Sequence, residues 1–118
     1  MRKTIYTTSG EVISIYDGDT FHARCDLGFK ILYEIKIRLF GINAAEMDTS
    51  AGREAAAKLA EFLPSGTFII IESQRLDKFG RSQAVVFRTM PNSKTRKEKI
   101  SINQLMIDSG FAVEMLTD

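Results

Sequence analysis

Several residue types that often define a metal site or a covalent staple are scarce in this sequence. It contains one cysteine, one histidine and two prolines among 118 residues. The single cysteine, Cys25, rules out a disulfide within the chain, and the single histidine, His22, has no second residue at metal-ligand spacing. No apolar run approaches the roughly 20 residues that a membrane-spanning helix needs. We therefore expect neither a disulfide nor a membrane partner.

The first residues bear on the location of the protein. Arg2 and Lys3 look like the start of a secretion signal, but no apolar stretch follows them. The chain as given is expected in the cytoplasm. A secreted or periplasmic location is expected instead if a leader has been removed.

The composition is that of a soluble globular protein. Hydrophobic residues make up 44% and charged residues 26% of the chain, both close to the average for such proteins. A chain of this length can bury a core without a metal or a disulfide. We expect one domain covering residues 1–118, with a monomer as the default.

The near-neutral net charge hides a strongly basic region. The segment from Arg75 to Lys99 has eight basic and two acidic residues, so it carries +6 and the rest of the chain −5, for a net charge of +1. A concentrated basic region attracts polyanions such as nucleic acids even when the total charge is small. A solvated basic loop explains the same pattern, and charge alone does not decide between the two.

Apolar periodicity predicts five β-strands and two helices. The predicted strands span residues 11–16, 20–24, 31–39, 67–72 and 84–88. The first helix is expected to begin at Thr49 or Ser50. The second begins at Ser101, with Gln104 completing a capping box and Gly110 ending the helix. One helix after the third strand and one after the fifth predict an α+β, mainly β fold, a five-stranded OB barrel with two flanking helices.

Four short segments combine glycines and charged residues in a distinctive order. They are DGDT (17–20), RLFGIN (38–43) with Glu46 downstream, DKFGR (77–81), and Gly110-Phe111-Ala112. Each segment alone is explained by a turn or an exposed loop. Together they resemble the staphylococcal (micrococcal) nuclease-like family, from about Val12 to Ala112. The family fold is an OB barrel with flanking helices, which agrees with the fold predicted from periodicity.

The resemblance implies a calcium site. Calcium takes six to eight oxygen ligands, and a hard cation can neutralise a nonbridging phosphate oxygen during hydrolysis. By resemblance, Asp19 is the first carboxylate ligand, Asn43 holds the second side-chain position, and the backbone carbonyl of Ala44 is the main-chain ligand. Asp17 is expected to shape the turn that presents Asp19.

The resemblance also implies three catalytic residues. Glu46 matches the glutamate that positions or deprotonates the attacking water. Arg38 and Arg81 match two arginines that bind phosphate oxygens and stabilise the transition state. The planar guanidinium group suits bidentate contact with phosphate.

Further contacts with nucleic acid are expected from basic and aromatic residues. Lys78 and Phe79 lie in the DKFGR segment, and Lys94, Arg96 and Lys97 lie in the loop of residues 89–99. Lysine and arginine can bind the phosphate backbone, and an aromatic ring can stack on a base. An exposed loop without a ligand explains the loop residues equally well. The three tyrosines, Tyr6, Tyr16 and Tyr33, are explained either by packing or by a place beside a nucleic-acid groove.

Three positions depart from the family pattern. Asn43 stands where an aspartate is usual, which keeps an oxygen donor but removes a negative charge and should lower metal affinity. Ala45 replaces a proline, which should loosen the loop because proline fixes a backbone dihedral angle. Phe79 replaces a tyrosine, which removes a hydroxyl group but keeps the aromatic face.

The first functional hypothesis is an enzyme, a calcium-dependent nuclease that hydrolyses phosphodiester bonds of DNA or RNA and is weakened by Asn43. The alternative is a catalytically degenerate nuclease-like OB module that binds nucleic acid or a protein partner without cutting. A protein-interaction barrel with no role in nucleic-acid binding is a third, weaker possibility.

Overall fold

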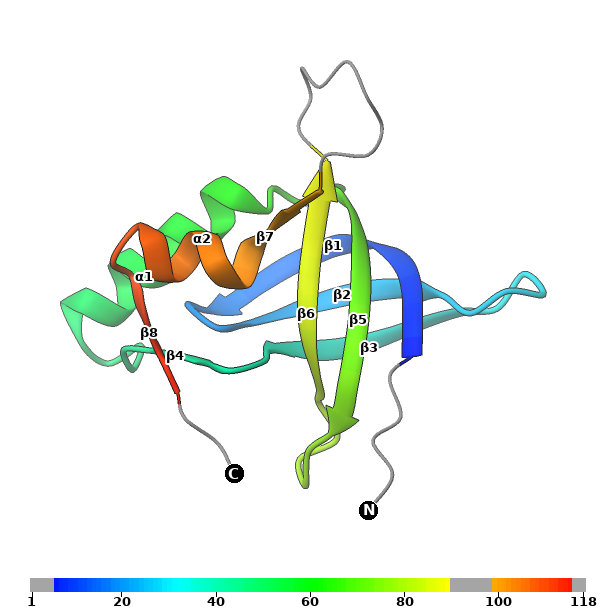
Figure 1. The fold of residues 1–118 in the computed structure, drawn as a ribbon, viewed down its shortest axis with the longest axis horizontal. Coiled ribbons are helices and arrows are strands. Elements are labelled where there is room, and N and C mark those ends of the chain that lie inside the picture. Colours follow the sequence, from blue (N-terminus) through cyan, green and yellow to red (C-terminus); the bar gives the residue numbers. More distant parts are fainter. Residues whose placement is uncertain (1–5, 90–98, 116–118) are drawn as a thin grey trace.

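The computed structural model describes residues 6–89 and 99–115 (Figure 1). The elements, in chain order, are β1 (Tyr6–Asp17), β2 (Thr20–Asp26), β3 (Leu32–Leu39), β4 (Ile42–Ala44), α1 (Ser50–Phe62), β5 (Phe68–Leu76), β6 (Ser82–Thr89), β7 (Lys99–Ser101), α2 (Ile102–Asp108) and β8 (Ala112–Glu114). All five predicted strands and both predicted helices are present, and most of the strands are longer than predicted.

Five long strands close into a barrel. The main sheet has the order β3-β2-β1-β5-β6-β7, and β3 also pairs with β6. This closing pair is parallel and short, running from Ile37 opposite Ser82 to Leu39 opposite Ala84. All the other pairs are antiparallel. The predicted α+β, mainly β OB-type barrel is confirmed.

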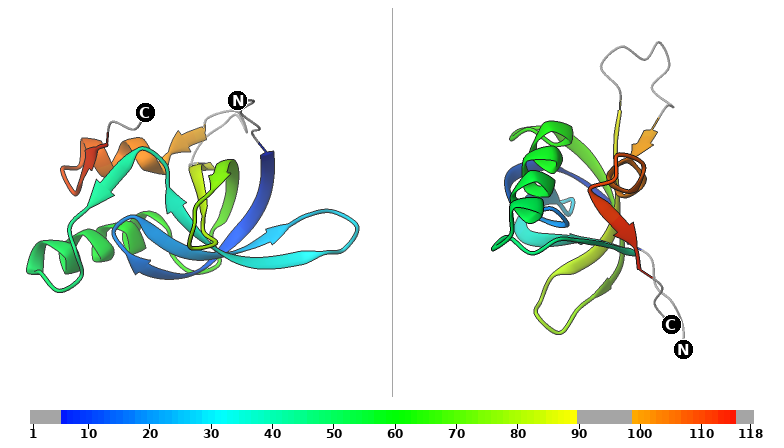
Figure 2. Two further views of the ribbon diagram at one scale, coloured as in Figure 1. Left: turned by 90° about the horizontal axis from the view of Figure 1, so that it is seen from below. Right: turned by 90° about the vertical axis from the view of Figure 1, so that its left-hand side faces the viewer.

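The alternation of apolar residues along the strands fills the barrel. Buried side chains come from every strand of the barrel: Val12, Phe21, Ala23, Cys25, Ile37, Leu39, Ile69, Ile71, Ala84 and Val86. Ala55, Leu59 and Leu63 of α1 and its C-cap join this core, as do Ile102 and Met106 of α2. Both helices lie at one end of the molecule, and the β2–β3 hairpin extends from the opposite end (Figures 1 and 2).

Both predicted helix starts are confirmed, but one detail of the capping is wrong. Thr49 caps α1 by accepting the backbone N–H of Gly52, and Ser101 caps α2 by accepting that of Gln104. The side chain of Gln104 does not complete a reciprocal capping box. It donates to Asp108 one turn later, at 2.8 Å, because glutamine at this position can reach a carboxylate four residues on.

Three short strands, β4, β7 and β8, were not predicted. Two of them, β4 and β8, lie at the candidate site. β4 and β8 form a separate antiparallel ladder in which Asn43 lies opposite Val113 and Ala44 opposite Ala112. Met115 extends this contact by donating its backbone N–H to Gly41 at 2.8 Å. β4 is therefore part of a sheet rather than a free loop, and this pairing restrains it despite the alanine at position 45.

Two further observations concern exposure and membranes. Tyr33 shares a face of β3 with the buried Ile37, yet it is 54% exposed. It sits near the hairpin end of β3, where the strand has extended beyond the core. Within the described part of the chain, no helix has the length and apolar character needed to cross a bilayer.

Candidate active site

A carboxylate and an arginine meet at the turn between β1 and β2. Asp19 and Arg38 form an ion pair at 2.8 Å, and their side chains are 10% and 13% exposed. The pairing of β2 with β3 brings them together, because Thr20, next to Asp19, lies directly opposite Arg38. The contact is short but poorly aligned for a hydrogen bond, so charge attraction is its main component.

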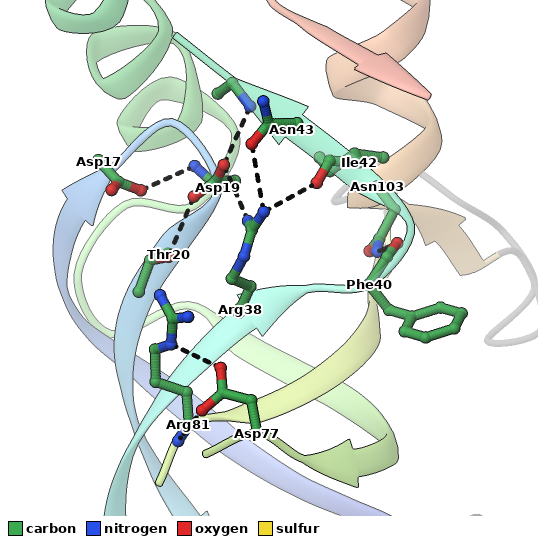
Figure 3. Close-up of polar contacts among 11 residues, drawn as sticks. Asp17, Asp19, Thr20, Arg38, Phe40, Ile42, Asn43, Asp77, Arg81 and Asn103 are labelled. Carbon is green, nitrogen blue, oxygen red and sulfur yellow. Dashed lines mark hydrogen bonds and ion pairs between the residues drawn. The ribbon is translucent and has the colours of Figure 1, made fainter. Parts of the chain in front are cut away.

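Arg38 joins three predicted site residues into one cluster (Figure 3). Its Nη2 group donates to Oδ1 of Asn43 at 3.3 Å and to the carbonyl of Ile42, also at 3.3 Å. One guanidinium therefore bridges the carboxylate of Asp19 and the amide oxygen of Asn43. The planar fork of arginine suits such a bridge, whereas the single ammonium of lysine does not.

The backbone of Ala44 completes the contact between the two segments. Its N–H donates to Oδ2 of Asp19 at 2.9 Å, while Oδ1 of Asp19 accepts from Thr20 at 3.1 Å. Hydrogen-bonded and non-hydrogen-bonded pairs alternate in an antiparallel ladder. The bond from Met115 to Gly41 puts Ala44 at a non-hydrogen-bonded position. The carbonyl of Ala44, like its N–H, therefore faces away from β8 and toward the side occupied by Asp19.

The oxygen donors beside Asp19 are of the types that a hard cation binds. Asp17 accepts the backbone N–H of Asp19 at 3.0 Å, which shapes the turn as expected. Burial and the adjacent Asp19 carboxylate raise the pKa of Asp17 to about 6, so two carboxyl groups lie close together. With the amide oxygen of Asn43 and the carbonyl of Ala44 nearby, this set resembles the mixture of donors that calcium accepts. Across the described residues, however, no cluster of three or more His, Cys, Asp and Glu side chains surrounds a metal position.

Glu46 is held through its backbone rather than its side chain. Its carbonyl accepts the N–H of Thr49 at 3.0 Å and the hydroxyl of Thr49 at 2.6 Å. Thr49 is also the N-cap of α1, so the start of this helix and the position of Glu46 depend on one another. The side chain of Glu46 is exposed to solvent, and the structure does not bring it into the Asp19–Arg38–Asn43 cluster.

Two glycines allow the segments around the cluster to approach closely. A Cβ atom at Gly52 would lie 1.7 Å from the carbonyl oxygen of Glu46. A Cβ atom at Gly18 would lie 2.6 Å from the Cβ of Ala55 and 2.7 Å from the Cβ of Ala44. Gly18 belongs to a motif selected from the sequence, but Gly52 was missed because a glycine inside a helix carries no evident signal.

Arg81 approaches the cluster from the β5–β6 hairpin. Its Nε donates to Asp77 at 2.7 Å, and its side chain lines a cavity of about 310 Å³ together with Thr20. In Figure 3 its guanidinium extends toward Thr20, the neighbour of Asp19. Arg38 lies opposite Gln83 of β6, and Arg81 comes two residues before Gln83, directly ahead of the start of β6.

The remaining predicted nucleic-acid residues fall into two groups. Lys78 and Phe79 are exposed at the tip of the β5–β6 hairpin, where Lys78 lies 5.4 Å and Arg81 5.2 Å from the centre of the Phe79 ring. The hairpin therefore presents an aromatic ring among cations. The other group, Lys94, Arg96 and Lys97, lies outside the described residues.

Asn103 is a structural residue that the sequence did not reveal. It is buried on α2, where Oδ1 accepts the N–H of Val86 at 3.0 Å. Its amide nitrogen donates to the carbonyls of Phe40 at 2.9 Å and Ala84 at 3.1 Å. It thus fixes the corner that follows Arg38 against β6 (Figure 3). A polar residue in a short helix normally suggests exposure, so no local signal identified this role.

Glu54 is another residue missed from the sequence. It lines a cavity of about 380 Å³ whose walls also include Asn43 and Ala44 on one side and Phe111 and Ala112 on the other. Nothing in the sequence marks Glu54, because a glutamate in the first half of a helix is usually an exposed charge. The β4–β8 pairing, which the sequence did not reveal, is what brings this cavity beside the cluster.

Fold and cluster together define a small OB-type barrel with a buried carboxylate–arginine pair at one turn. Over 103 residues the chain is 28% identical to a protein named Micrococcal nuclease from Shigella flexneri, covering 87% of this chain and 56% of that protein. It is 26% identical over 103 residues to Protein ParB from Escherichia coli, covering 87% of this chain and 55% of that protein. No protein-family model matches the chain.

These similarities bear on the class of the protein. The chain spans a little over half the length of both relatives. The similarity to the first is distant homology extending over most of the chain. It supports a nuclease-like domain, in agreement with the resemblance drawn from the four motifs.

Proposed function

We propose that this protein is a phosphodiesterase that hydrolyses DNA or RNA and uses calcium as its cofactor. The observation that carries the proposal is the bridge that Arg38 makes between Asp19 and Asn43. Arg38 lies beside both candidate ligands, so its guanidinium would bind a phosphate when a cation takes the oxygens of Asp19 and Asn43. The distant similarity to a micrococcal nuclease supports the same interpretation.

Two arginines are assigned to the phosphate. Arg38 offers its fork from the barrel, and Arg81 extends from the hairpin to the same face. Preorganised donors of this kind stabilise the charge that develops on phosphate oxygens during attack. Asp77 holds Arg81 through its carboxylate at 2.7 Å, which restricts the guanidinium before the substrate arrives.

Glu46 is assigned to the attacking water. Its exposed carboxylate follows β4, two residues after Ala44, and its backbone is fixed by the cap of α1. A general base contributes typically about 10²–10⁴ in rate. Because the carboxylate is exposed, its place in the reaction depends on the substrate bringing the scissile phosphate toward this loop.

Asp19, Asn43 and the carbonyl of Ala44 would hold calcium. When bound, the cation supplies charge neutralisation to a nonbridging phosphate oxygen. The protein offers few charged ligands here, since Asn43 is neutral, so water and substrate would fill most of the coordination sphere. Calcium affinity is therefore expected to be low.

The test is cleavage of end-labelled single-stranded DNA and RNA in calcium and in a chelator. We expect cutting that requires calcium and falls by about 10²-fold or more in Glu46→Gln. Glu61→Gln is the matched control, because Glu61 is an exposed glutamate of α1 whose contact is an ion pair with Lys58 at 3.7 Å. Intact substrate at high protein concentration would overturn the proposal.

A negative result with retained binding would favour the non-cutting module. Asn43 already uses its amide oxygen to accept from Arg38, as a purely structural residue would. Salt-sensitive binding of an oligonucleotide without cleavage would then indicate that the barrel binds phosphate groups but does not hydrolyse phosphodiester bonds.

A further inference from the structure

A second feature lies on the same face as the arginines. The 310 Å³ cavity that contains Arg81 is lined by Tyr16, Thr20, Lys36 and Phe79 as well. Two of these residues are aromatic and two are cationic. Neither Tyr16 nor Lys36 belongs to the four motifs or to the cluster of Asp19, Arg38 and Asn43.

Strand register and a break in the β1 register bring these residues together. Lys36 and Arg38 are two residues apart on β3, and they lie opposite His22 and Thr20 of β2. His22 in turn lies opposite Ser14 of β1, and Tyr16 follows at the register break between Ile15 and Asp17. There its ring centre lies 4.6 Å from the ammonium of Lys36. A two-residue step along a strand is about 7 Å and returns to the same face. Lys36 is thus one such step from the arginine that holds Asp19.

The aromatic rings of this cavity are available to a ligand. Tyr16 is 58% exposed and Phe79 is 71% exposed, so neither ring packs in the core. Lys36 lies 4.6 Å from the centre of the Tyr16 ring, and Arg81 lies 5.2 Å from that of Phe79. Each ring therefore has a cation beside it and surface left uncovered. Of the three tyrosines named from the sequence, Tyr16 is the one that lines this cavity.

We propose that this cavity is a nucleotide subsite that takes one unpaired base next to the phosphate bound by Arg38 and Arg81. The proposal rests on the proposed function, which supplies that phosphate. The base stacks on Tyr16, with Phe79 as the opposite wall, and Lys36 binds the adjoining phosphate. Aromatic surfaces of this kind accept any base, because every base has a π-face, and they require a strand whose bases are unpaired. The subsite therefore selects single-stranded substrate.

The test compares two single-stranded probes that have the same phosphates. One is a short oligothymidylate, and the other is the same backbone with abasic sites in place of every base. Binding is measured by fluorescence anisotropy in a chelator, so that no cutting occurs. We expect Tyr16→Ala to weaken binding of the oligothymidylate by roughly 5- to 100-fold and to leave binding of the abasic strand unchanged.

Two further variants distinguish binding of the base from binding of the phosphate. Lys36→Met should weaken binding of both probes and reduce the dependence of affinity on salt, because it removes a phosphate contact. Tyr33→Ala is the control, since Tyr33 is similarly exposed but lies on the opposite face of β3, and it should alter neither probe.

A spectroscopic variant gives an independent readout. The sequence contains no tryptophan, so Tyr16→Trp places a single fluorophore in the cavity and keeps an aromatic surface. Its emission should be quenched by the oligothymidylate and not by the abasic strand. Equal losses on both probes with Tyr16→Ala, or no quenching of Tyr16→Trp, would overturn the subsite.

The test of the subsite and the test of the proposed function can fail independently of each other. Suppose that Tyr16→Ala weakens binding of the oligothymidylate alone, but the parent protein never cuts. The subsite would then be supported and the phosphodiesterase rejected. Suppose instead that the parent protein cuts, but Tyr16→Ala binds both probes as the parent does. The phosphodiesterase would then be supported and the subsite rejected.

Discussion

At the scale of single residues, Arg38 and Asn43 define the character of the site. Arg38 satisfies a buried carboxylate and an amide oxygen at once. Removing one partner of a buried pair leaves an uncompensated charge, which is strongly destabilising. Asn43 keeps the geometry of an oxygen donor without its charge. The site therefore retains its arrangement while its total negative charge is reduced.

Asn43→Asp tests whether this position binds the cation. A second carboxylate beside Asp19 should tighten calcium binding by roughly tenfold or more, because charge on the ligands is a main determinant of affinity for a hard cation. Isothermal titration calorimetry measures the affinity directly, and cleavage at limiting calcium should rise with it. Unchanged calcium affinity would mean that Asn43 is not a ligand.

Residue identity predicted part of this site and missed the rest. The DGDT and RLFGIN segments marked Asp19 and Arg38, and the strand pairing brings them to 2.8 Å. Asn103 and Gly52 gave no such signal, since their importance depends on which backbone atoms approach them. Such approaches are set by tertiary packing, which a single sequence does not display.

At the scale of elements, the start of α1 and the loop before it form one unit. Thr49 caps the helix and binds the carbonyl of Glu46, while Gly52 lets that carbonyl approach the helix. The short β4–β8 ladder fixes the other end of the same loop. Three-residue strands formed between distant segments have too little periodicity to be recognised, which is why this ladder was not predicted.

Gly52→Ala tests the close approach of Glu46 to α1. Alanine in place of glycine normally stabilises a helix by about 0.5–1 kcal/mol. Here the new Cβ would meet the Glu46 carbonyl oxygen at 1.7 Å, so the variant should instead lose about 2 kcal/mol or more and cut poorly. Urea denaturation measures the loss.

Ala57→Gly supplies the comparison for that experiment. Ala57 is exposed in the same helix, so the change should cost about 1 kcal/mol through helix propensity alone and leave cleavage unchanged. If Gly52→Ala proved as stable as the parent and fully active, the tight packing of the Glu46 loop would not matter for the site.

The β5–β6 hairpin depends on an ionised Asp77. Burial works against ionisation of Asp77. The backbone N–H groups of Arg81 and Phe79 and the guanidinium of Arg81 outweigh it and hold the pKa of Asp77 below its usual range. A carboxyl group whose pKa is lowered by folding adds stability above its unfolded pKa, and this is lost as the pH falls through the folded pKa. Asparagine can still accept the two backbone bonds, so it removes mainly the charge.

Asp77→Asn should therefore lower the free energy of unfolding by about 1 kcal/mol near neutral pH. The difference from the parent should stay constant between about pH 5 and 8 and shrink below about pH 4. Urea denaturation over a pH series measures it, with the exposed Asp48→Asn as control. A difference that grows as the pH falls would contradict this account of the hairpin.

At the scale of the whole molecule, barrel closure places the two arginines on one face. The parallel contact between β3 and β6 is short, yet it brings Arg38 beside the start of β6, which Arg81 directly precedes. The number and order of the long strands followed from apolar periodicity, and the barrel followed from the need to cover sheet edges. The β3–β6 register could not be read from sequence, because it depends on the twist of all five strands together.

The central claim is that the Arg38 bridge forms a phosphodiesterase site, and Arg38→Lys tests it most directly. Lysine keeps the charge beside Asp19 but cannot bridge to Asn43. The measurement is the single-turnover rate of cleavage of an end-labelled single-stranded oligonucleotide at saturating calcium, with melting curves to verify folding. Arg53→Lys, an exposed arginine of α1, is the control. The account predicts a loss of about 10²–10³ for Arg38→Lys and a rate like that of the parent for the control. A folded Arg38→Lys protein that cuts as fast as the parent would contradict it.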